Sequence, residues 1–282
     1  MTLPNVPATL TPMRKVTVTR VGRGAPAARE DVAAAEEPLD VRLQGQSFAI
    51  IMRTPGDDRA LAAGFLFSER VIRRSADIGA VEHCRHPDQS QVHHVVNVFL
   101  RGDAATAALK HLEQRRRVVA NSSCGVCGRA SIEELRADIP ALTASSRVHA
   151  AVIGALPGQL RQRQVTFDET GGLHAAGLFD LSGALVASAE DVGRHNAVDK
   201  VVGAMLLEDR LPLPPAILMV SGRVSFEIVQ KAWLAGVPVV AAVSAPTSLA
   251  IDLAREAGIT LIGFVRDGGF NIYAHEVRIL DV

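Results

Sequence analysis

This sequence contains few cysteines, no long apolar run and no pattern typical of a secretory signal. Three cysteines in 282 residues are too few, and odd in number, for a disulfide framework, which favours a reducing compartment. The first residues lack the basic n-region and the unbroken apolar stretch of a secretory signal. Apolar runs such as 216–220 and 237–243 are far too short to span a membrane. We therefore expect a cytoplasmic protein with no membrane partner.

Net charge is also missing. Thirty basic residues are matched by thirty acidic ones, so the chain lacks the overall positive field that nucleic-acid-binding proteins usually show. We expect no nucleic-acid partner, and any anionic ligand must be held by a local site. With 48% hydrophobic and 21% charged residues, the composition is that of an ordinary globular protein. Its length is typical of about two domains.

The first part of the chain predicts a loose arm followed by a small α+β domain. Residues 1–38 are rich in Pro, Ala, Thr and Glu, which indicates a flexible arm with a possible edge strand at 15–21. Residues 39–120 are expected to form the N-terminal α+β domain. Its predicted elements are two strands within 41–52 around Gly45, a helix from an Asp57 N-cap to about residue 74, a strand at 92–100 and a helix at about 104–116.

Residues 121–282 are expected to form a three-layer α/β domain. Buried strands are expected at 216–220, 237–243 and 259–265, with helices at 226–235 and 248–257 between them. This alternation of strand and helix is typical of a mainly parallel sheet. Before them, a hairpin turning at Ser182-Gly183 is predicted within 173–189, and an amphipathic helix at 196–207.

A C-x-x-C motif is the clearest candidate for chemistry. In the segment Asn121-Ser-Ser-Cys124-Gly-Val-Cys127-Gly128, the glycines predict an open loop between a basic helix end at 115–117 and a new helix with a capping box at 131–134. Nearby positive charge and a helix N-terminus both favour thiolate over thiol. Two-residue spacing lets one sulfur attack a persulfide or disulfide on the other. The motif therefore suits redox chemistry or carriage of a sulfane sulfur.

Other roles for the cysteines stay open. A structural zinc site needs four ligands, and the chain offers this pair plus Cys84 and a run of histidines at 83, 86, 93 and 94. Two buried, inert thiols fit less well, since the flanking residues are polar. A zinc deaminase is disfavoured because its mechanism needs a Glu two residues after the histidine, whereas Ala176 follows His174 at that spacing.

Polar residues in the connections between a strand and the next helix predict an anion-binding site. Ser221-Gly222-Arg223 follows an apolar strand and precedes a helix, so its backbone N–H groups and its guanidinium suit a phosphate. A plain strand-to-helix turn explains the spacing equally well. Residues 244–247 form a similar connection between a strand and a helix, and the next strand ends with Phe264-Val-Arg266. In a parallel sheet, all three would meet at the carboxyl edge, where ligands gather.

Residues 191–196 concentrate polar groups at a helix start. Asp191, Arg194, His195 and Asn196 supply an acid, a base, an imidazole and an amide, which indicates either a site or an elaborate helix cap. The site is favoured, because one acid or amide would suffice as a cap. His174, beside small apolar residues, is more typical of hydrogen-bonded packing than of catalysis.

Together these segments resemble the formate dehydrogenase accessory sulfurtransferases, the FdhD/NarQ family. The resemblance rests on Ser-Cys124-Gly-Val-Cys127-Gly and on four further segments in the family's order, at 168–176, 190–200, 221–225 and 263–269. It implies a cytidine-deaminase-like three-layer α/β fold with a smaller N-terminal α+β domain, and a homodimer. Residues 1–100 match weakly, apart from a helix at 58–69, and Cys84 gains no role.

The resemblance also implies a reaction. The protein would be a sulfurtransferase that accepts persulfide sulfur from a cysteine desulfurase and passes it to the molybdenum bis(molybdopterin guanine dinucleotide) cofactor, as formate dehydrogenase requires. Cys124 would carry the persulfide and Cys127 would assist, although which thiol takes sulfur first stays open. A non-catalytic cofactor-binding chaperone is the alternative, and a guanine nucleotide is expected to occupy the same site. The expected cofactor-binding residues are Phe264, Val265, Arg266, Asp267, Gly268, Gly269, Ser221, Gly222, Arg223, Arg194 and His195.

Overall fold

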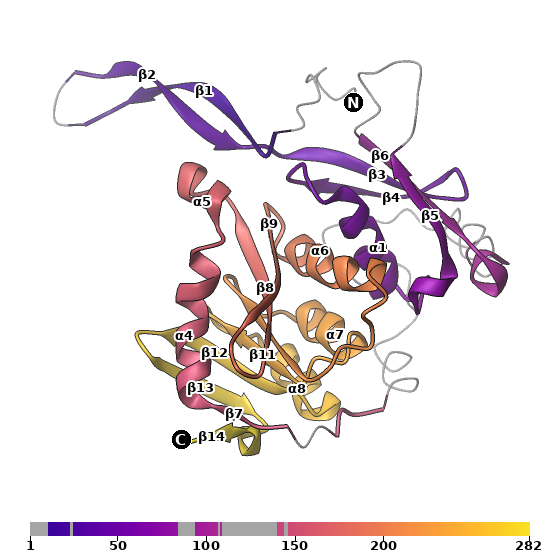
Figure 1. Ribbon diagram of the computed structural model, residues 1–282. Coiled ribbons are helices and arrows are strands. Elements are labelled where there is room, and N and C mark those ends of the chain that lie inside the picture. Colours follow the sequence, from indigo (N-terminus) through magenta and orange to yellow (C-terminus); the bar gives the residue numbers. More distant parts are fainter. Residues whose placement is uncertain (1–10, 23–24, 84–93, 107, 109–139, 144–145) are drawn as a thin grey trace.

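The computed structural model describes residues 11–22, 25–83, 94–106, 108, 140–143 and 146–282 (Figure 1). All three cysteines, including the predicted Cys124–Cys127 motif, lie outside these ranges. The predicted helix at 104–116 is described only at its start, where residues 102–106 are helical. Within the described ranges, no helix combines the length and the apolar character needed to cross a membrane.

A six-stranded mixed sheet forms the centre of the second half of the chain. The strand order is β13-β12-β11-β10-β8-β9, with β10, β11 and β12 parallel and the other neighbours antiparallel. The predicted parallel strands and the hairpin at Ser182-Gly183 between β8 and β9 are confirmed. The prediction of a mainly parallel sheet is wrong, because β8, β9 and β13 all pair antiparallel with their neighbours. The bounds are β8 His174–Asp180, β9 Leu185–Asp191, β10 Ala216–Val220, β11 Val239–Ala242, β12 Thr260–Arg266 and β13 Gly269–Ala274.

Helices cover both faces of this sheet, as the three-layer prediction requires. Helix α4 (Ala150–Arg161) lies on one face, and α6 (Arg194–Leu207), α7 (Phe226–Leu234) and α8 (Ser248–Ala257) lie on the other (Figure 1). Successive residues of β10 alternate between the layers. Ile217 and Met219 pack into the cluster with α4, whereas Leu218 and Val220 pack into the cluster with α6, α7 and α8. Because both faces are buried, β10 and β11 are apolar throughout, and β12 is apolar between Thr260 and Arg266 at its ends.

Several short elements complete this half of the chain. Helix α5 (Val165–Thr170) follows α4, and a small parallel pair joins β7 (Val148–His149) to β14 (Ile279–Leu280) after the 3₁₀ turn η3 (Glu276–Arg278). The sequence analysis did not predict α4. Gly154, Pro157 and Gly158 interrupt its helical pattern, and its buried residues Ile153, Leu156 and Leu160 hold it against the sheet instead.

The N-terminal part builds a second, four-stranded sheet with the order β4-β3-β6-β5. Its elements are β3 (Glu37–Leu43), β4 (Gln46–Arg53), α1 (Asp58–Ser68), the 3₁₀ turn η1 (Ser75–Asp77), β5 (Ile78–His83) and β6 (Val95–Leu100). The predicted strands around Gly45 are confirmed. Helix α1 ends earlier than the predicted residue 74, because Arg70 adopts a left-handed conformation with φ 60°. Asp57 precedes the helix, but its side chain makes no cap hydrogen bond.

One hydrophobic core joins the two sheets. Leu61 and Leu66 of α1 belong to the same buried cluster as Val198 and Val202 of α6 and as Leu218 of the central sheet. Helix α1 lies between α6 and the four-stranded sheet (Figure 1). The core is therefore continuous across the chain position, near residue 120, where the sequence predicts a domain boundary.

The N-terminal arm contains a β-hairpin. Strands β1 (Met13–Arg20) and β2 (Ala27–Ala34) pair with each other over eight residues and extend away from the body (Figure 1). The predicted edge strand is thus one of two, and the expectation of an otherwise flexible arm is wrong for 27–34. Alanines and charged residues make up most of β2, and Val32 is its one β-branched residue, so its pattern gives little sign of a strand.

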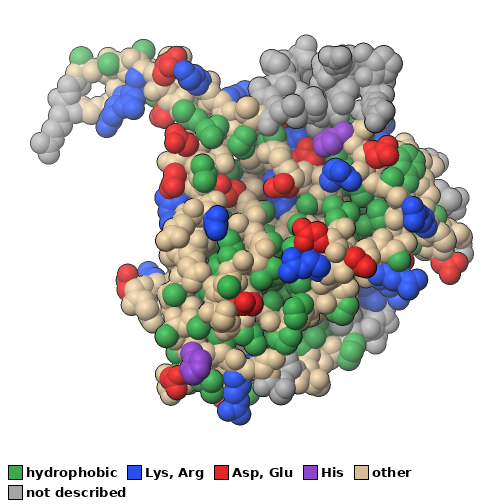
Figure 2. Space-filling model, viewed as in Figure 1, with side chains coloured by type: hydrophobic (Ala, Val, Ile, Leu, Met, Phe, Trp, Pro, Cys, Tyr) green, Lys and Arg blue, Asp and Glu red, His purple; other side chains and the backbone are tan. Residues whose placement is uncertain are grey.

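Acidic and basic side chains are interspersed over the face of the molecule shown in Figure 2. That distribution agrees with the balance of thirty basic and thirty acidic residues in the sequence.

Candidate functional site

The carboxyl ends of the parallel strands meet at one edge, as the sequence analysis expects. The segment after β10 runs beside the segment after β11, since Val224 N donates to Ala245 O at 3.2 Å and Thr247 N donates to Val224 O at 2.9 Å. The end of β12 joins them, because Phe264 N donates to Ser244 O at 3.2 Å. Three polar segments that are distant in the sequence therefore form a continuous carboxyl edge of the sheet.

His174 lies at the same edge. Strand β8 runs antiparallel to β10, so its first residue, His174, lies beside the segment that follows β10. A Cβ built on Gly222 would lie 3.1 Å from His174 Nδ1 and 3.6 Å from Arg194 Cδ. A side chain at 222 would therefore crowd the His174 ring, which would have to shift to make room. Burial lowers the pKa of His174, and the positive charges of Arg194 and His195 lower it further, against a smaller opposite effect of Asp191.

His195 is held between two side chains of the α7 start. Its Nε2 is 2.8 Å from Ser225 Oγ, and its Nδ1 is 2.8 Å from Glu227 Oε2. The hydrogen bond from His195 lowers the pKa of Glu227, more than burial of the carboxyl raises it. Ser225, which lies in the motif segment 221–225, and Glu227 were not predicted as site residues from the sequence. Their signal is a serine and a glutamate in the first turn of a helix that follows a buried strand.

Three arginines without an ion pair to any described residue lie along this carboxyl edge. Arg194 Nε is buried and has no hydrogen-bond partner in the part of the chain that the structure describes. The exposed Arg223 and Arg266 form no ion pair with any described residue, and the Arg266 guanidinium lies 5.8 Å from the centre of the Phe264 ring. These arginines leave positive charge available for an anion at the carboxyl edge.

The predicted cofactor segment, 264–269, is a tight connection between β12 and β13. Phe264, Asp267 and Gly268 have φ values of 55°, 52° and 76°. Gly268 lies under α4, where a Cβ on Gly154 would be 3.3 Å from its Cα. Val265 is fully buried in the core cluster with α4, so its side chain is not available to a ligand. The remaining five residues of the segment are half-buried or exposed.

Asp191 and Asn196 serve the structure. The buried Asp191 carboxylate accepts from Thr54 N at 3.2 Å, from Gly193 N at 2.8 Å and from Asn196 Nδ2 at 2.8 Å. Asn196 Nδ2 also donates to Met52 O at 2.8 Å. The two roles predicted for 191–196, a functional site and support of the helix start, therefore fall on different residues. The acid and the amide tie the α6 start to the N-terminal sheet, whereas Arg194 and His195 face the carboxyl edge.

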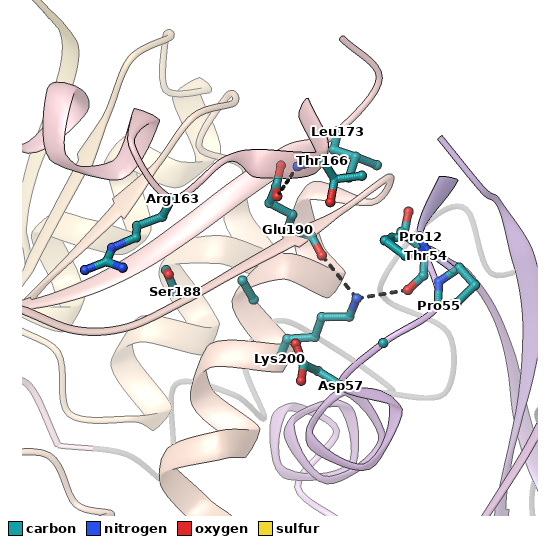
Figure 3. A pocket seen from close by; sticks show the side chains of 12 residues that line it. Pro12, Thr54, Pro55, Asp57, Arg163, Thr166, Leu173, Ser188, Glu190 and Lys200 are labelled. Atoms are coloured by element: carbon teal, nitrogen blue, oxygen red, sulfur yellow. Dashed lines mark hydrogen bonds between the residues drawn. The ribbon is translucent and has the colours of Figure 1, made fainter. Parts of the chain in front are cut away.

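A separate pocket adjoins the contact between the α6 start and residue Thr54 (Figure 3). It has a volume of about 320 Å³, and it lies between the 54–57 loop, α5 and β9. The Lys200 amine at its wall is 2.8 Å from Asp191 Oδ2 and donates to Thr54 O at 3.0 Å and Glu190 O at 3.1 Å. The Glu190 carboxylate accepts from the backbone of Thr166 and Phe167. These wall charges are already partnered, and the sequence analysis did not predict the pocket.

In the described ranges, no three side chains of His, Cys, Asp or Glu are grouped to hold a metal ion. His94, one of the histidines considered for zinc, instead lies 3.1 Å from Pro38 O and 3.8 Å from a Glu37 carboxylate oxygen.

The fold and this edge define an α/β protein with a cationic site at the carboxyl ends of a central sheet. Comparison with known proteins gives the family. The model of the FdhD/NarQ family matches residues 34–280. Two sulfur carrier proteins FdhD are similar over most of their length, one from Streptomyces avermitilis and one from Anaeromyxobacter dehalogenans. The first is 48% identical over 93% of this chain and 94% of the relative, and the second 50% identical over 88% of each. The chain therefore belongs to the FdhD/NarQ family.

A solved structure agrees with this assignment. It comes from Desulfotalea psychrophila, and the protein is described as a formate dehydrogenase accessory protein. It superposes with a TM-score of 0.72 at 25% identity and covers 95% of this chain and 98% of its own. The family predicted from the sequence motifs and the α/β fold are both confirmed.

Proposed function

We propose that this chain is a cytoplasmic sulfurtransferase that carries a sulfane sulfur from a cysteine desulfurase to the molybdenum bis(molybdopterin guanine dinucleotide) cofactor of formate dehydrogenase. Family membership over residues 34–280 carries the proposal, together with relatives that are named sulfur carriers. The C-x-x-C motif supplies the thiol chemistry that a sulfur carrier needs.

Cys124 receives the sulfur in this scheme. Its thiolate attacks the terminal sulfur of the donor persulfide, the S–S bond of the donor breaks, and the donor leaves as a thiolate. Attack by Cys127 on the inner sulfur of the Cys124 persulfide then releases sulfide and leaves a Cys124–Cys127 disulfide. The two electrons that reduce the sulfane sulfur to sulfide come from oxidation of the two thiols to the disulfide. A cellular thiol reductant then restores both thiols.

The positive charge at the carboxyl edge supports binding of the dinucleotide cofactor there. Pyrophosphate groups of a dinucleotide are anionic, and Arg194, Arg223 and Arg266 offer guanidinium groups without acidic partners among the described residues. Ser221 and Gly222 bring backbone close to the same edge, where the absence of a Cβ at 222 leaves room for His174. Phe264 and the 266–269 turn would complete the binding segment at the end of β12.

Intact-mass spectrometry tests sulfur carriage. We expect the wild-type chain, incubated with a cysteine desulfurase and cysteine, to gain the mass of one sulfur, and a reductant to remove it. Cys124→Ala should abolish the gain, and Cys84→Ala is the matched control for loss of a thiol outside the motif. If the Cys124→Ala/Cys127→Ala variant still gains sulfur and still restores formate dehydrogenase activity, the cysteine assignment is wrong.

A non-catalytic cofactor chaperone is the second candidate, because arginines without an ion pair to any described residue favour binding of an anionic dinucleotide whether or not sulfur moves. It predicts tight binding of a guanine nucleotide without any mass gain. We also infer a homodimer, which analytical ultracentrifugation of the full chain tests.

A further inference from the structure

Ser225, His195 and Glu227 form an unbroken hydrogen-bonded chain at the carboxyl edge. The carboxylate of Glu227 can only accept, so His195 carries its proton on Nδ1, which is 2.8 Å from Glu227 Oε2. In the neutral ring, Nε2 then holds a lone pair, and the hydroxyl of Ser225 donates to it at 2.8 Å. The arrangement is that of a serine, its general base and the acid that orients the base.

The position of Ser225 shows that this contact replaces a more usual one. Ser225 is the N-cap residue of α7, where a hydroxyl commonly accepts from the first turn, yet its side chain makes no cap hydrogen bond. Thr247 holds the equivalent position before α8, and its hydroxyl does accept from Ala250 N at 3.3 Å. Helix α7 thus lacks a side-chain cap that commonly stabilises a helix start, and the hydroxyl contacts His195 instead.

The surroundings favour an ionised acid and an accessible base. His195 and Glu227 keep 28% and 19% of their side-chain surface exposed, so the chain of three residues lies at the surface of the edge. The hydrogen bond from His195, with smaller contributions from Lys231 and Arg194, lowers the pKa of Glu227. Lys231 is itself bound to the buried Asp199 at 2.7 Å, which leaves Glu227 to orient the histidine.

Donors for a developing oxyanion are also present. The backbone N–H groups of Phe226 and Glu227 lie in the first turn of the nine-residue α7, and no described residue accepts from either. A nucleophile at a helix start after a buried strand, with the next residue's N–H as oxyanion donor, is the arrangement of α/β-hydrolases.

We propose that Ser225 is an activated nucleophile, with His195 as its general base and Glu227 as the residue that positions His195, giving this chain an esterase activity toward carboxylic esters that carry a negative charge. The preference for an anion follows from Arg194, the residue before the base, whose Nε has no partner among the described residues, and from the exposed Arg223 two residues before the nucleophile. This activity lies outside the proposed sulfur transfer and requires no cysteine.

The reaction balances without a cofactor. Ser225 Oγ attacks the ester carbonyl carbon while its proton moves to His195 Nε2. The bond from that carbon to the alcohol oxygen then breaks, and the leaving alkoxide takes the proton from His195. Water, deprotonated by the same Nε2, cleaves the acyl-serine and restores the hydroxyl.

Labelling with an alkyl fluorophosphonate tests the nucleophile directly, because such probes modify activated serines. We expect one adduct on the full-length chain, mapped by peptide mass spectrometry to Ser225. Ser225→Ala should remove it, and Glu227→Gln should slow labelling by about 100-fold or more, within the range of general-base effects. Ser248→Ala, in the exposed first turn of α8, is the matched control and should label like the wild type.

Two ester substrates then test the charge preference. Thiolates also cleave activated esters, so 4-nitrophenyl acetate and 4-nitrophenyl hemisuccinate are compared in the Cys124→Ala/Cys127→Ala variant. We expect the anionic ester to have the higher kcat/KM, and Arg194→Gln to reduce that preference by about 10-fold, as loss of one charged hydrogen bond does. Absence of a Ser225 adduct at millimolar probe, in a chain whose circular dichroism is native, would overturn the proposal.

Discussion

Gly203 of α6 lies directly against Gly64 of α1. A Cβ built on Gly203 would be 2.6 Å from Gly64 N and closer still to Ala60 O, and a Cβ on Gly64 would overlap the carbonyl of Asp199. The two helices therefore cross with their backbones in contact, and no side chain fits between them. This crossing joins the N-terminal sheet to the central one, since both helices lie in the shared core.

Gly203→Ala should consequently destabilise the whole chain. The new methyl group meets backbone atoms rather than a flexible side chain, so the helices must separate, at a cost of about 1–3 kcal/mol or more in the free energy of unfolding. Urea denaturation monitored by circular dichroism measures it. Gly158→Ala in α4 is the control, because a Cβ there meets nothing within 4 Å. It should stabilise the chain by about 0.5–1 kcal/mol, and equal effects of the two variants would contradict the crossing geometry.

The ion pair between Lys200 and Asp191 predicts a second large effect. Both side chains are buried, at 2% and 0% exposure, and their charged atoms are 2.8 Å apart. Lys200→Met would leave the Asp191 carboxylate buried without its counter-ion, which typically costs about 3–5 kcal/mol. Thermal denaturation should show the loss. Lys15→Met removes a pair with Glu30 in which both side chains are more than three-quarters exposed, and it should leave the midpoint nearly unchanged.

His174 predicts a pH dependence of stability. Its pKa is lowered in the folded chain, mainly by burial, so the unfolded chain binds a proton at a higher pH than the folded chain does. The free energy of unfolding should therefore fall as the pH drops through the ordinary histidine value of about 6.5 and continue to fall until the folded chain also takes up the proton. His174→Gln should flatten this part of the curve. His149→Gln, at a 63% exposed side chain, is the control, and a slope unchanged by His174→Gln would refute the assignment.

Guanine nucleotides should bind at the carboxyl edge. We expect calorimetric titration with GDP to give a dissociation constant that rises about 10-fold or more in Arg223→Gln, since a hydrogen bond to a charged group is typically worth about 1.5–3 kcal/mol. Raising the salt concentration should weaken binding as well. Arg255→Gln, on the outer face of α8 beside Asp252, is the control. A dissociation constant that is the same in both variants would move the site away from this edge.

Local patterns in the sequence predicted much of the central domain correctly. The strands at 216–220 and 259–265 are confirmed because short, mostly apolar runs of that length suit a strand buried on both faces. Helix α4 escaped prediction because Gly154 and Pro157 weaken its local pattern, and packing against the sheet outweighs that preference. The hairpin of β1 and β2 escaped for a related reason, since pairing between the two strands compensates for the weak propensity of β2.

The candidate site was predicted in part. Its segments were located because Gly, Ser and Arg at strand ends are a local signal, and parallel strands bring such ends together. Val265 was included with its neighbours, although its side chain is buried. Ser225 and Glu227 were omitted, because their relation to His195 spans about thirty residues of sequence and exists only after α6 and α7 pack on the same face of the sheet.

The sequence by itself determined the family, the thiol motif, the order of the strands and helices predicted between residues 173 and 265, and the absence of net charge, because each is encoded in neighbouring residues or in composition. Only the tertiary structure decided that Asp191 and Asn196 support the fold while Arg194 and His195 face the edge, and that α1 and α6 meet at two glycines. Those choices depend on which backbones approach each other across the core. That approach is set by close packing of distant segments, which local periodicity does not encode.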